Sequence, residues 1–188
     1  TAAAGAVGAL DDQLDTNVTT LAVSAGSGGA FLKDSSGLTI DTVTTTVNRV
    51  SAAGSSAAIT PDSLQDATTT GAGALVLEAG GTLTINAGTA GTSGTPAVGV
   101  SATGNLLLKT TTGSAGDIVL NATVSSSAGD ISLTSDRDVL QNTAASYTDG
   151  NIMATGTAKT VDVYAARNIT MSSTVASTRS ERSITASG

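Results

Sequence analysis

The chain contains no cysteine and no histidine among its 188 residues. The absence of histidine excludes Ser-His-Asp catalysis and histidine-ligated zinc. The absence of cysteine excludes thiol nucleophiles, thiolate metal sites and the disulfides on which small secreted domains usually depend. A fold of this composition must be stabilised in another way, and carboxylate chemistry is what remains for an enzymatic function.

Aromatic residues and prolines are also scarce. Only 2% of the residues are aromatic, with no tryptophan, and the chain has two prolines, Pro61 and Pro96. Since 39% of the residues are nevertheless hydrophobic, the core must consist of Val, Leu, Ile and Ala. Such a core suits a narrow interior of stacked aliphatic side chains. No apolar run approaches the roughly 20 residues of a membrane-spanning helix.

Basic residues are few as well. Eight Lys and Arg stand against 15 Asp and Glu, which gives a net charge of −7. Because phosphate binding needs clustered Lys or Arg, nucleic acid is not an expected partner. The chain begins at Thr1 without a signal peptide, and we therefore expect it to be a processed product or a piece of a longer protein.

What the sequence does have is a short phrase that recurs: a glycine, a small or polar residue, and then aliphatic residues at alternate positions. Clear copies begin at Gly73, Gly81, Gly104, Gly116 and Gly129, and weaker ones at Gly150 and Arg167. Each copy predicts a turn that leads into a short strand with one apolar face. Repetition of one strand unit is typical of a solenoid. We predict an all-β fold, a parallel β-helix with few or no helices.

The spacing of the phrases predicts a coil of about 20–25 residues, given the rise of roughly 3.3 Å per strand residue. The intervals Leu83 to Leu106, Leu106 to Ile131 and Ile131 to Ile152 are interpreted as complete turns. Residues 1–188 form one predicted β-helix segment, from which residues 88–97, rich in Gly, Thr and Ser, leave as an outward loop. Val43, Val47 and Val50 are expected to continue the coil in the amino-terminal third.

An immunoglobulin-like sandwich is the structural alternative, but it usually needs a buried aromatic anchor and does not explain a glycine at the same place before each strand. Asparagines recur beside the aliphatic phrases, at Asn86, Asn105, Asn121 and Asn151. In a coil these amides are expected to form hydrogen bonds along a corner. The general preference of asparagine for turns is the simpler explanation of these positions.

Acidic residues are the remaining candidates for a site. Asp136 and Asp138, with Arg137 between them and Asp130 one side away, are the best candidates for a glycosidase or lyase pair. Asp11, Asp12 and Asp15, or Asp136 with Asp138, are conceivable calcium ligands. The spacing matches no known calcium loop, and a solvated turn explains both groups. We therefore predict no catalytic, cofactor-binding or metal-binding residues and no cofactor.

The phrases of residues 116–122 and 129–135, together with 138–142 and 161–171, resemble the stalk repeats of filamentous haemagglutinin-like exoproteins of Gram-negative bacteria. The resemblance covers most of the chain and implies a right-handed parallel β-helix on the outer cell surface or in a secreted fibre. The secretion domain of that family typically has Asn-Pro-Asn turns, whereas both prolines here follow threonine. The resemblance is therefore to the stalk.

These observations favour a non-enzymatic, structural or adhesive role: a rigid segment of an extracellular fibre, for which stacking into filaments is a further expectation. The expected partners are copies of itself or neighbouring coils of the same fibre, and host or surface glycans. The alternative is a β-helix module that binds or cleaves polysaccharide. A third hypothesis is an immunoglobulin-like adhesin repeat, which would have the same adhesive role in a different fold.

Overall fold

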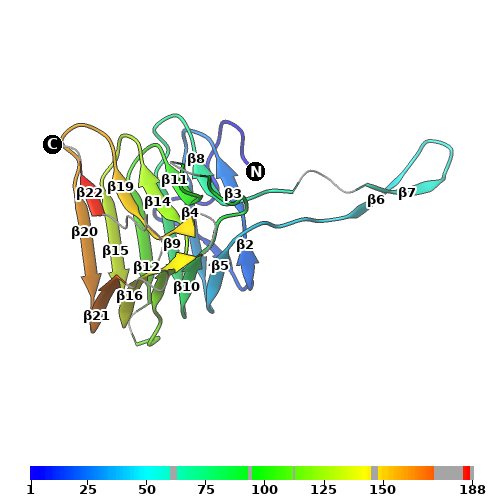
Figure 1. Cartoon of the computed structure of the whole chain (residues 1–188). Helices are drawn as coiled ribbons and strands as arrows, with labels where there is room; N and C mark the ends of the chain where they lie inside the picture. The colour runs from blue at the N-terminus through cyan, green and yellow to red at the C-terminus, as the bar shows by residue number, and fades with distance from the viewer. Residues whose placement is uncertain (60–62, 93–94, 112, 145–147, 172–183, 187–188) are drawn as a thin grey trace.

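Three parallel β-sheets form the body of the molecule (Figure 1). The computed structural model describes residues 1–59, 63–92, 95–111, 113–144, 148–171 and 184–186. These residues are strands, turns and loops, without a helix. The chain visits the three sheets in turn and pairs each strand in parallel with the strand one coil earlier. The predicted parallel β-helix is confirmed.

Each sheet contains six strands. Sheet 1 consists of β1 (Leu14–Thr16), β4 (Ala30–Asp34), β9 (Leu75–Ala79), β12 (Leu106–Thr110), β15 (Ile131–Ser135) and β20 (Val161–Ala165). Sheet 2 consists of β2 (Thr20–Leu21), β5 (Leu38–Ile40), β10 (Leu83–Ile85), β13 (Ile118–Leu120), β16 (Asp138–Gln141) and β21 (Asn168–Met171). Sheet 3 consists of β3 (Val23–Ala25), β8 (Ala67–Thr69), β11 (Val98–Ala102), β14 (Thr123–Ser126), β19 (Ile152–Ala154) and β22 (Ile184–Ala186).

The core is a set of columns of aliphatic side chains that run along the axis of the coil. One column of sheet 1 contains Leu32, Leu77, Leu108 and Leu133, which are direct partners from coil to coil and almost fully buried. Alternate residues of each strand point inward, so the period-2 pattern of the phrases fills the interior. Each buried leucine contributes about 2 kcal/mol of hydrophobic stabilisation.

Glycine is required where successive turns lie directly on one another. Gly104 and Gly129 occupy equivalent positions before β12 and β15, and a Cβ on Gly129 would overlap the backbone of Gly104. Gly81 and Gly116 form a second stack before β10 and β13, where a Cβ on Gly116 would overlap Gly81. The recurring glycine therefore marks the corners of the coil, as the sequence predicts.

The predicted coil length holds only where no residues are inserted. Leu106 pairs with Ile131, which confirms that interval as one turn. The other two intervals are wrong, because Leu83 and Leu106 lie in different sheets, as do Ile131 and Ile152. Insertions of variable length between sheets 2 and 3 make spacing along the sequence a poor measure of one turn.

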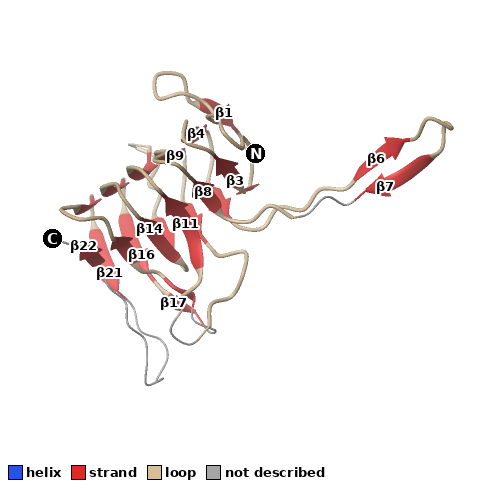
Figure 2. Ribbon diagram, turned by 90° about the horizontal axis from the view of Figure 1, so that it is seen from above, coloured by secondary structure: helices blue, strands red, loops and turns tan. Residues whose placement is uncertain are grey.

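The amino-terminal third also departs from the prediction. Val47 and Val50 do not continue the coil; they lie in β6 (Val47–Val50), which pairs with β7 (Ser56–Ile59) as an antiparallel hairpin. Val43 forms a bridge with Leu64 at the base of this hairpin. Residues 47–59, here called the arm, project far from the body (Figures 1 and 2). A strand-like valine pattern does not reveal whether its partner belongs to the coil or to a hairpin.

Candidate functional site

The long insertions leave the coil at one corner, where the chain passes from sheet 2 to sheet 3. The connections at the other two corners have between two and seven residues, whereas those at this corner include residues 41–66, 86–97 and 142–151. A fourth, residues 172–183, lies outside the described residues. The arm and the hairpin of β17 (Thr143–Ala144) and β18 (Thr148–Asp149) leave the same side of the body (Figure 2). We call this corner the insertion corner.

A ladder of side-chain hydrogen bonds runs along the insertion corner. Asn86 Nδ2 donates to Asp41 Oδ2 at 3.0 Å, Asn121 Nδ2 donates to Asn86 Oδ1 at 2.9 Å, and Asn142 Nδ2 donates to Asn121 Oδ1 at 2.9 Å. Each of these residues directly follows a strand of sheet 2. The ladder fixes the end of each strand, so an insertion can leave without disturbing the coils above and below it.

The predicted asparagine ladder is therefore confirmed for Asn86 and Asn121, whereas the other two asparagines of the prediction precede strands instead of following them. Asn105 Oδ1 accepts the backbone N–H of Asp130 at 3.0 Å at a different corner. Asn151 precedes β19 in sheet 3 and is buried. Asn142, which is not among the four predicted asparagines, completes the ladder.

The base of the arm is joined to the predicted loop 88–97, which lies in the connection between β10 and β11. Gly88 N–H donates to Asp66 Oδ1 at 2.8 Å, and Thr89 Oγ1 donates to Gln65 Oε1 at 2.6 Å. Asp66 has a left-handed backbone with φ of 62°. Burial raises the pKa of its carboxyl group, and the nearby Asp41 carboxylate raises that pKa further.

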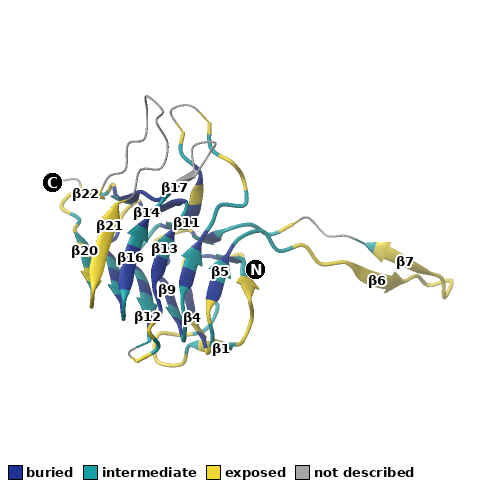
Figure 3. Cartoon of the chain, turned by 60° about the horizontal axis from the view of Figure 1, so that its bottom comes forward, coloured by how far each residue is buried: buried dark blue, intermediate teal, exposed yellow. Residues whose placement is uncertain are grey.

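The arm itself exposes both faces to solvent (Figure 3). Val47 and Val50 are 53% and 67% exposed. A two-stranded hairpin has little stability of its own and offers unpaired backbone groups along both edges. The arm therefore presents exposed valines at the insertion corner, where it is well placed to contact another molecule.

The candidate carboxylates Asp136 and Asp138 lie at the corner between sheets 1 and 2, where both accept hydrogen bonds from other residues of the coil. Arg167 Nε donates to Asp138 Oδ1 at 2.9 Å, and its second nitrogen pairs with Oδ2. Asp136 Oδ2 accepts the backbone N–H of Ala115 at 2.9 Å. The Arg167 and Asn168 hydrogen bonds lower the pKa of Asp138 to about 2.

The same arrangement occurs one coil earlier. Arg137 Nε donates to Asp117 Oδ1 at 2.7 Å and pairs with its other oxygen. Arg137 therefore lowers the pKa of Asp117. Each arginine reaches back to the aspartate of the preceding coil, so these charges bind successive coils together.

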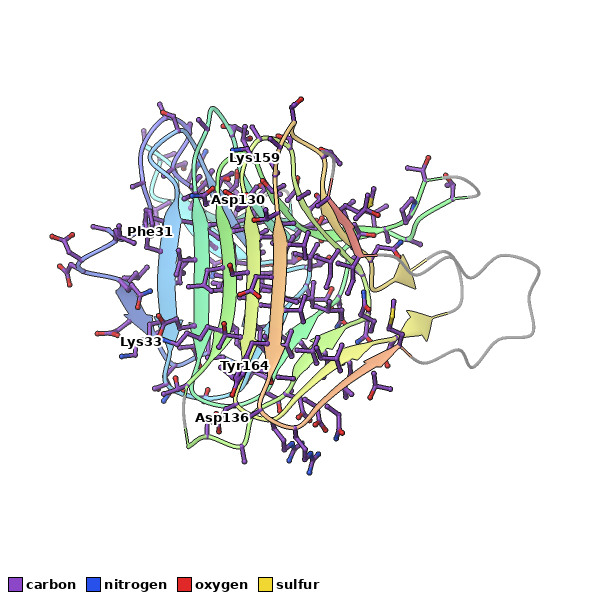
Figure 4. All side chains as sticks on the ribbon, turned by 90° about the vertical axis from the view of Figure 1, so that its left-hand side faces the viewer. Phe31, Lys33, Asp130, Asp136, Lys159 and Tyr164 are labelled. Carbon is purple, nitrogen blue, oxygen red and sulfur yellow. The ribbon has the colours of Figure 1, made fainter. Side chains whose placement is uncertain are left out.

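Asp130 is not beside this pair. It precedes β15 whereas Asp136 follows it, and the two lie at opposite ends of the strands in Figure 4. Six residues of extended chain span about 20 Å, which exceeds the separation of glycosidase carboxyl groups. Asp130 Oδ1 instead accepts the backbone N–H and the hydroxyl of Thr160. Asp130 therefore lies one side of the coil away from Asp136 and Asp138, as expected, and too far from them to form a catalytic pair.

The outer face of sheet 1 carries a column that includes charged side chains. One column of outward side chains contains Asp15, Lys33, Glu78, Lys109, Thr134 and Tyr164. Its first four members alternate in sign, and Lys109 forms a 3.4 Å ion pair with Glu78. Figure 4 shows Lys33 and Tyr164 on this face. The equivalent outward column of sheet 2, which contains Thr39, Thr84, Val119 and Leu140, is uncharged.

The candidate calcium ligands are distributed rather than gathered. Asp11 and Asp12 are exposed in the turn before β1, and Asp15 is the direct partner of Lys33. In the described part of the chain, no three Asp or Glu side chains are grouped closely enough to hold a metal ion. The same residues include no helix long and apolar enough to cross a membrane.

Comparisons with protein-family models, curated proteins and solved structures found no match to this chain. Its function must therefore be argued from the geometry above. The insertion corner is the feature that distinguishes one side of an otherwise regular coil.

Proposed function

We propose that this chain is a structural segment of a bacterial cell-surface or secreted fibre, with the coil as a rigid stalk and the insertion corner as its contact surface. The observation that carries the proposal is the placement of the insertions. Three sheets stack without interruption, while the connections of ten or more residues between them all leave from one corner. In solenoid repeats, insertions gathered on one side often form the binding face.

The construction of the coil supports the role of a stalk. Every inner strand has a parallel partner on both sides, so bending the coil would break main-chain hydrogen bonds and open the aliphatic columns. The Asp–Arg pairs and the amide ladder add cross-links between coils at two corners. Rigidity thus comes from the repeat itself, without disulfides.

The proposed role is non-catalytic and needs no cofactor. The candidate carboxylates Asp136 and Asp138 already hold structural hydrogen bonds, which argues against their use in polysaccharide cleavage. The proposed partners are neighbouring coils of the same fibre, and glycans or proteins on the surface to which the fibre adheres. The proposed location is the outer surface of a Gram-negative cell or the surrounding medium.

Antibodies against the arm, applied to intact cells of the producing organism, test the location. Labelling of intact cells supports the proposal, and labelling that appears only after the cells are permeabilised contradicts it.

Shortening the arm tests its contact role. Because Val47 and Ile59 are direct partners, a two-residue Gly-Ser turn can replace residues 48–58 and leave the body intact. We expect this variant to melt as the unaltered chain does and to lose adhesion of the cells. Lys33→Ala, on the far face of sheet 1, is the matched control and should adhere normally. Equal adhesion by all three chains would show that the arm is not the contact.

A further inference from the structure

The segment that leads from the body into the arm reads nearly the same in both directions. Residues 41–49 have the sequence Asp-Thr-Val-Thr-Thr-Thr-Val-Asn-Arg, which is centred on Thr45. Val43 and Val47 lie at equal distances from this centre, and the two ends, Asp41 and Arg49, have opposite charges. When two antiparallel copies of such a strand pair about the centre, each residue faces its counterpart in the other copy. The segment is therefore complementary to itself.

The outer edge of this segment is open. Val43 exchanges two backbone hydrogen bonds with Leu64. Ser51 N–H donates to the Ser55 carbonyl at the tip of the arm. Because an antiparallel strand bonds to one neighbour at every second residue, Asn48 directs its N–H and C=O groups away from β7. In the described part of the chain β6 pairs with β7 alone. This edge can therefore accept a further strand.

Charge complementarity identifies the strand that fits this edge. Arg49 is the one charged residue between positions 42 and 59, and it is exposed. Asp41 accepts hydrogen bonds from Thr42 N–H and from Asn86, and the ion pairs within the described residues do not include it. A carboxylate has about four acceptor sites, so Asp41 keeps sites for a guanidinium. In antiparallel pairing about Thr45, Arg49 of each copy lies opposite Asp41 of the other.

The same pairing covers apolar surface and completes a sheet. Val47 is 53% exposed, and in this register it lies opposite Val43 of the second copy. Since side chains alternate along a strand, both valines lie on the face that carries Asp41 and Arg49. A two-stranded hairpin is only marginally stable in water, whereas two arms paired along β6 form a four-stranded sheet. The contact therefore stabilises the arms as well as joining them.

We propose that the arm docks on the arm of a second copy, with residues 41–49 of the two chains paired as antiparallel strands about a two-fold axis at Thr45. This inference rests on the proposed role of the insertion corner as a contact surface, and it names the partner of that surface. Both copies use the same residues, so the contact closes as a dimer. Because the arm projects far from the body (Figure 1), the dimer joins two stalks through their arms.

A cysteine at the two-fold axis tests the register, because the chain has no cysteine of its own. Thr45 and its counterpart form a non-hydrogen-bonded pair, with Cα atoms about 4.5 Å apart, which is within disulfide range. We expect Thr45→Cys to form a disulfide-linked dimer under mild oxidation. Val47→Cys, on the same face, is the matched control. Its two copies lie four positions apart in this register, or about 13 Å, so it should not link to itself.

Mixing variants gives the positive form of the same test. Val43→Cys and Val47→Cys should each remain unlinked alone and should link to each other when mixed, because these positions are opposite in the proposed pairing. Gel electrophoresis without reductant reads out the linked dimers. Absence of linkage in Thr45→Cys, or equal linkage in Thr45→Cys and Val47→Cys, would overturn the proposal.

Reversing the charge of Arg49 tests the ends of the paired segment. Arg49→Glu places two carboxylates opposite each other at two sites of the dimer, so it should weaken dimerisation about 10-fold. Arg49→Lys keeps the charge and should dimerise nearly as the unaltered chain does. Sedimentation equilibrium measures the three dissociation constants, and circular dichroism checks that the variants are folded. An unaltered chain that stays monomeric at high concentration, or equal constants for all three chains, would overturn the proposed pairing.

Failure of this pairing can be told apart from failure of the proposed function. A chain that stays monomeric, but whose shortened-arm variant loses adhesion on labelled intact cells, would refute the pairing alone. An arm that links through Thr45→Cys, but is labelled by antibodies only in permeabilised cells, would refute the surface role and leave the pairing in place.

Discussion

The amide of Asn121 donates a 2.9 Å hydrogen bond to Oδ1 of Asn86, its equivalent one coil earlier. Asn121 also accepts a hydrogen bond from Asn142 one coil later. Because every amide carries both a donor and an acceptor, asparagine can extend such a ladder from coil to coil. Asp41, an acceptor only, stands at its first position, where it receives a bond and donates none.

Replacing Asn121 by alanine should therefore remove two hydrogen bonds at once. We expect Asn121→Ala to lower the free energy of unfolding by about 2 kcal/mol. Asn48→Ala, at an exposed position of the arm, is the matched control and should change the stability little. Urea unfolding of the two variants checks the difference, and equal midpoints would show that the ladder does not stabilise the coil.

Acid should weaken the coil through the Asp–Arg pairs. Arg167 and Asn168 lower the pKa of Asp138 to about 2, and Arg137 lowers that of Asp117. A carboxyl group whose pKa is lower in the folded state stabilises the fold above its unfolded pKa and loses that contribution as the pH falls. We expect the melting temperature to fall between about pH 4 and pH 2. In Arg167→Gln, which lacks one pair, the melting temperature should fall less steeply in acid.

The contribution of Asp66 to stability should have the opposite pH dependence. Burial and Asp41 raise its pKa, so its ionised form is unfavourable in the folded state. Asparagine keeps an oxygen to accept the N–H of Gly88 and tolerates the positive φ. Asp66→Asn should therefore raise the melting temperature slightly at neutral pH and change it little in acid, where the aspartate is protonated. A lower melting temperature at neutral pH would show that the charge is needed.

The regular parts of this fold could be predicted from the sequence because they repeat. A glycine precedes both β12 and β15 because both strands begin at the same corner of the coil. The alternating leucines recur because successive strands contribute to the same core column. The arm could not be predicted in this way, because Val47 and Val50 have the alternation of a coil strand and only the tertiary fold selects β7 as their partner.

The candidate site was predictable only in part, for a related reason. Asn86 and Asn121 belong to the ladder because both follow strands of sheet 2, whereas Asn105 and Asn151 precede strands. Assigning an asparagine to one corner requires knowing which sheet its strand joins. Insertions of different length hide that assignment in the sequence.

Glu78 should stabilise the fold through its attraction to the lysines beside it on the outer face of sheet 1. It lies between Lys33 and Lys109, its direct partners. Because parallel strands pair in register, residues at equivalent positions of successive strands lie side by side, and a lysine at position 78 would lie directly between two other lysines. Glu78→Lys should lower the free energy of unfolding by about 1 kcal/mol, and added salt should restore part of the loss. Glu78→Gln, which removes the attraction without adding repulsion, should lose less. Equal losses at all salt concentrations would contradict the electrostatic explanation.

Successive coils approach each other very closely at Gly129, and a substitution there should have the largest effect on stability. A Cβ on Gly129 would overlap the backbone of Gly104, so an alanine there must push two turns apart. Overpacking of this kind costs about 3 kcal/mol, because backbone cannot move aside as a flexible side chain can. Gly5→Ala is the matched control, since a Cβ at Gly5 has no atom within 4 Å. Thermal unfolding should show a clear loss for Gly129→Ala and none for Gly5→Ala. Equal melting temperatures would mean that the corner can open, and a corner that opens could not hold the stalk rigid.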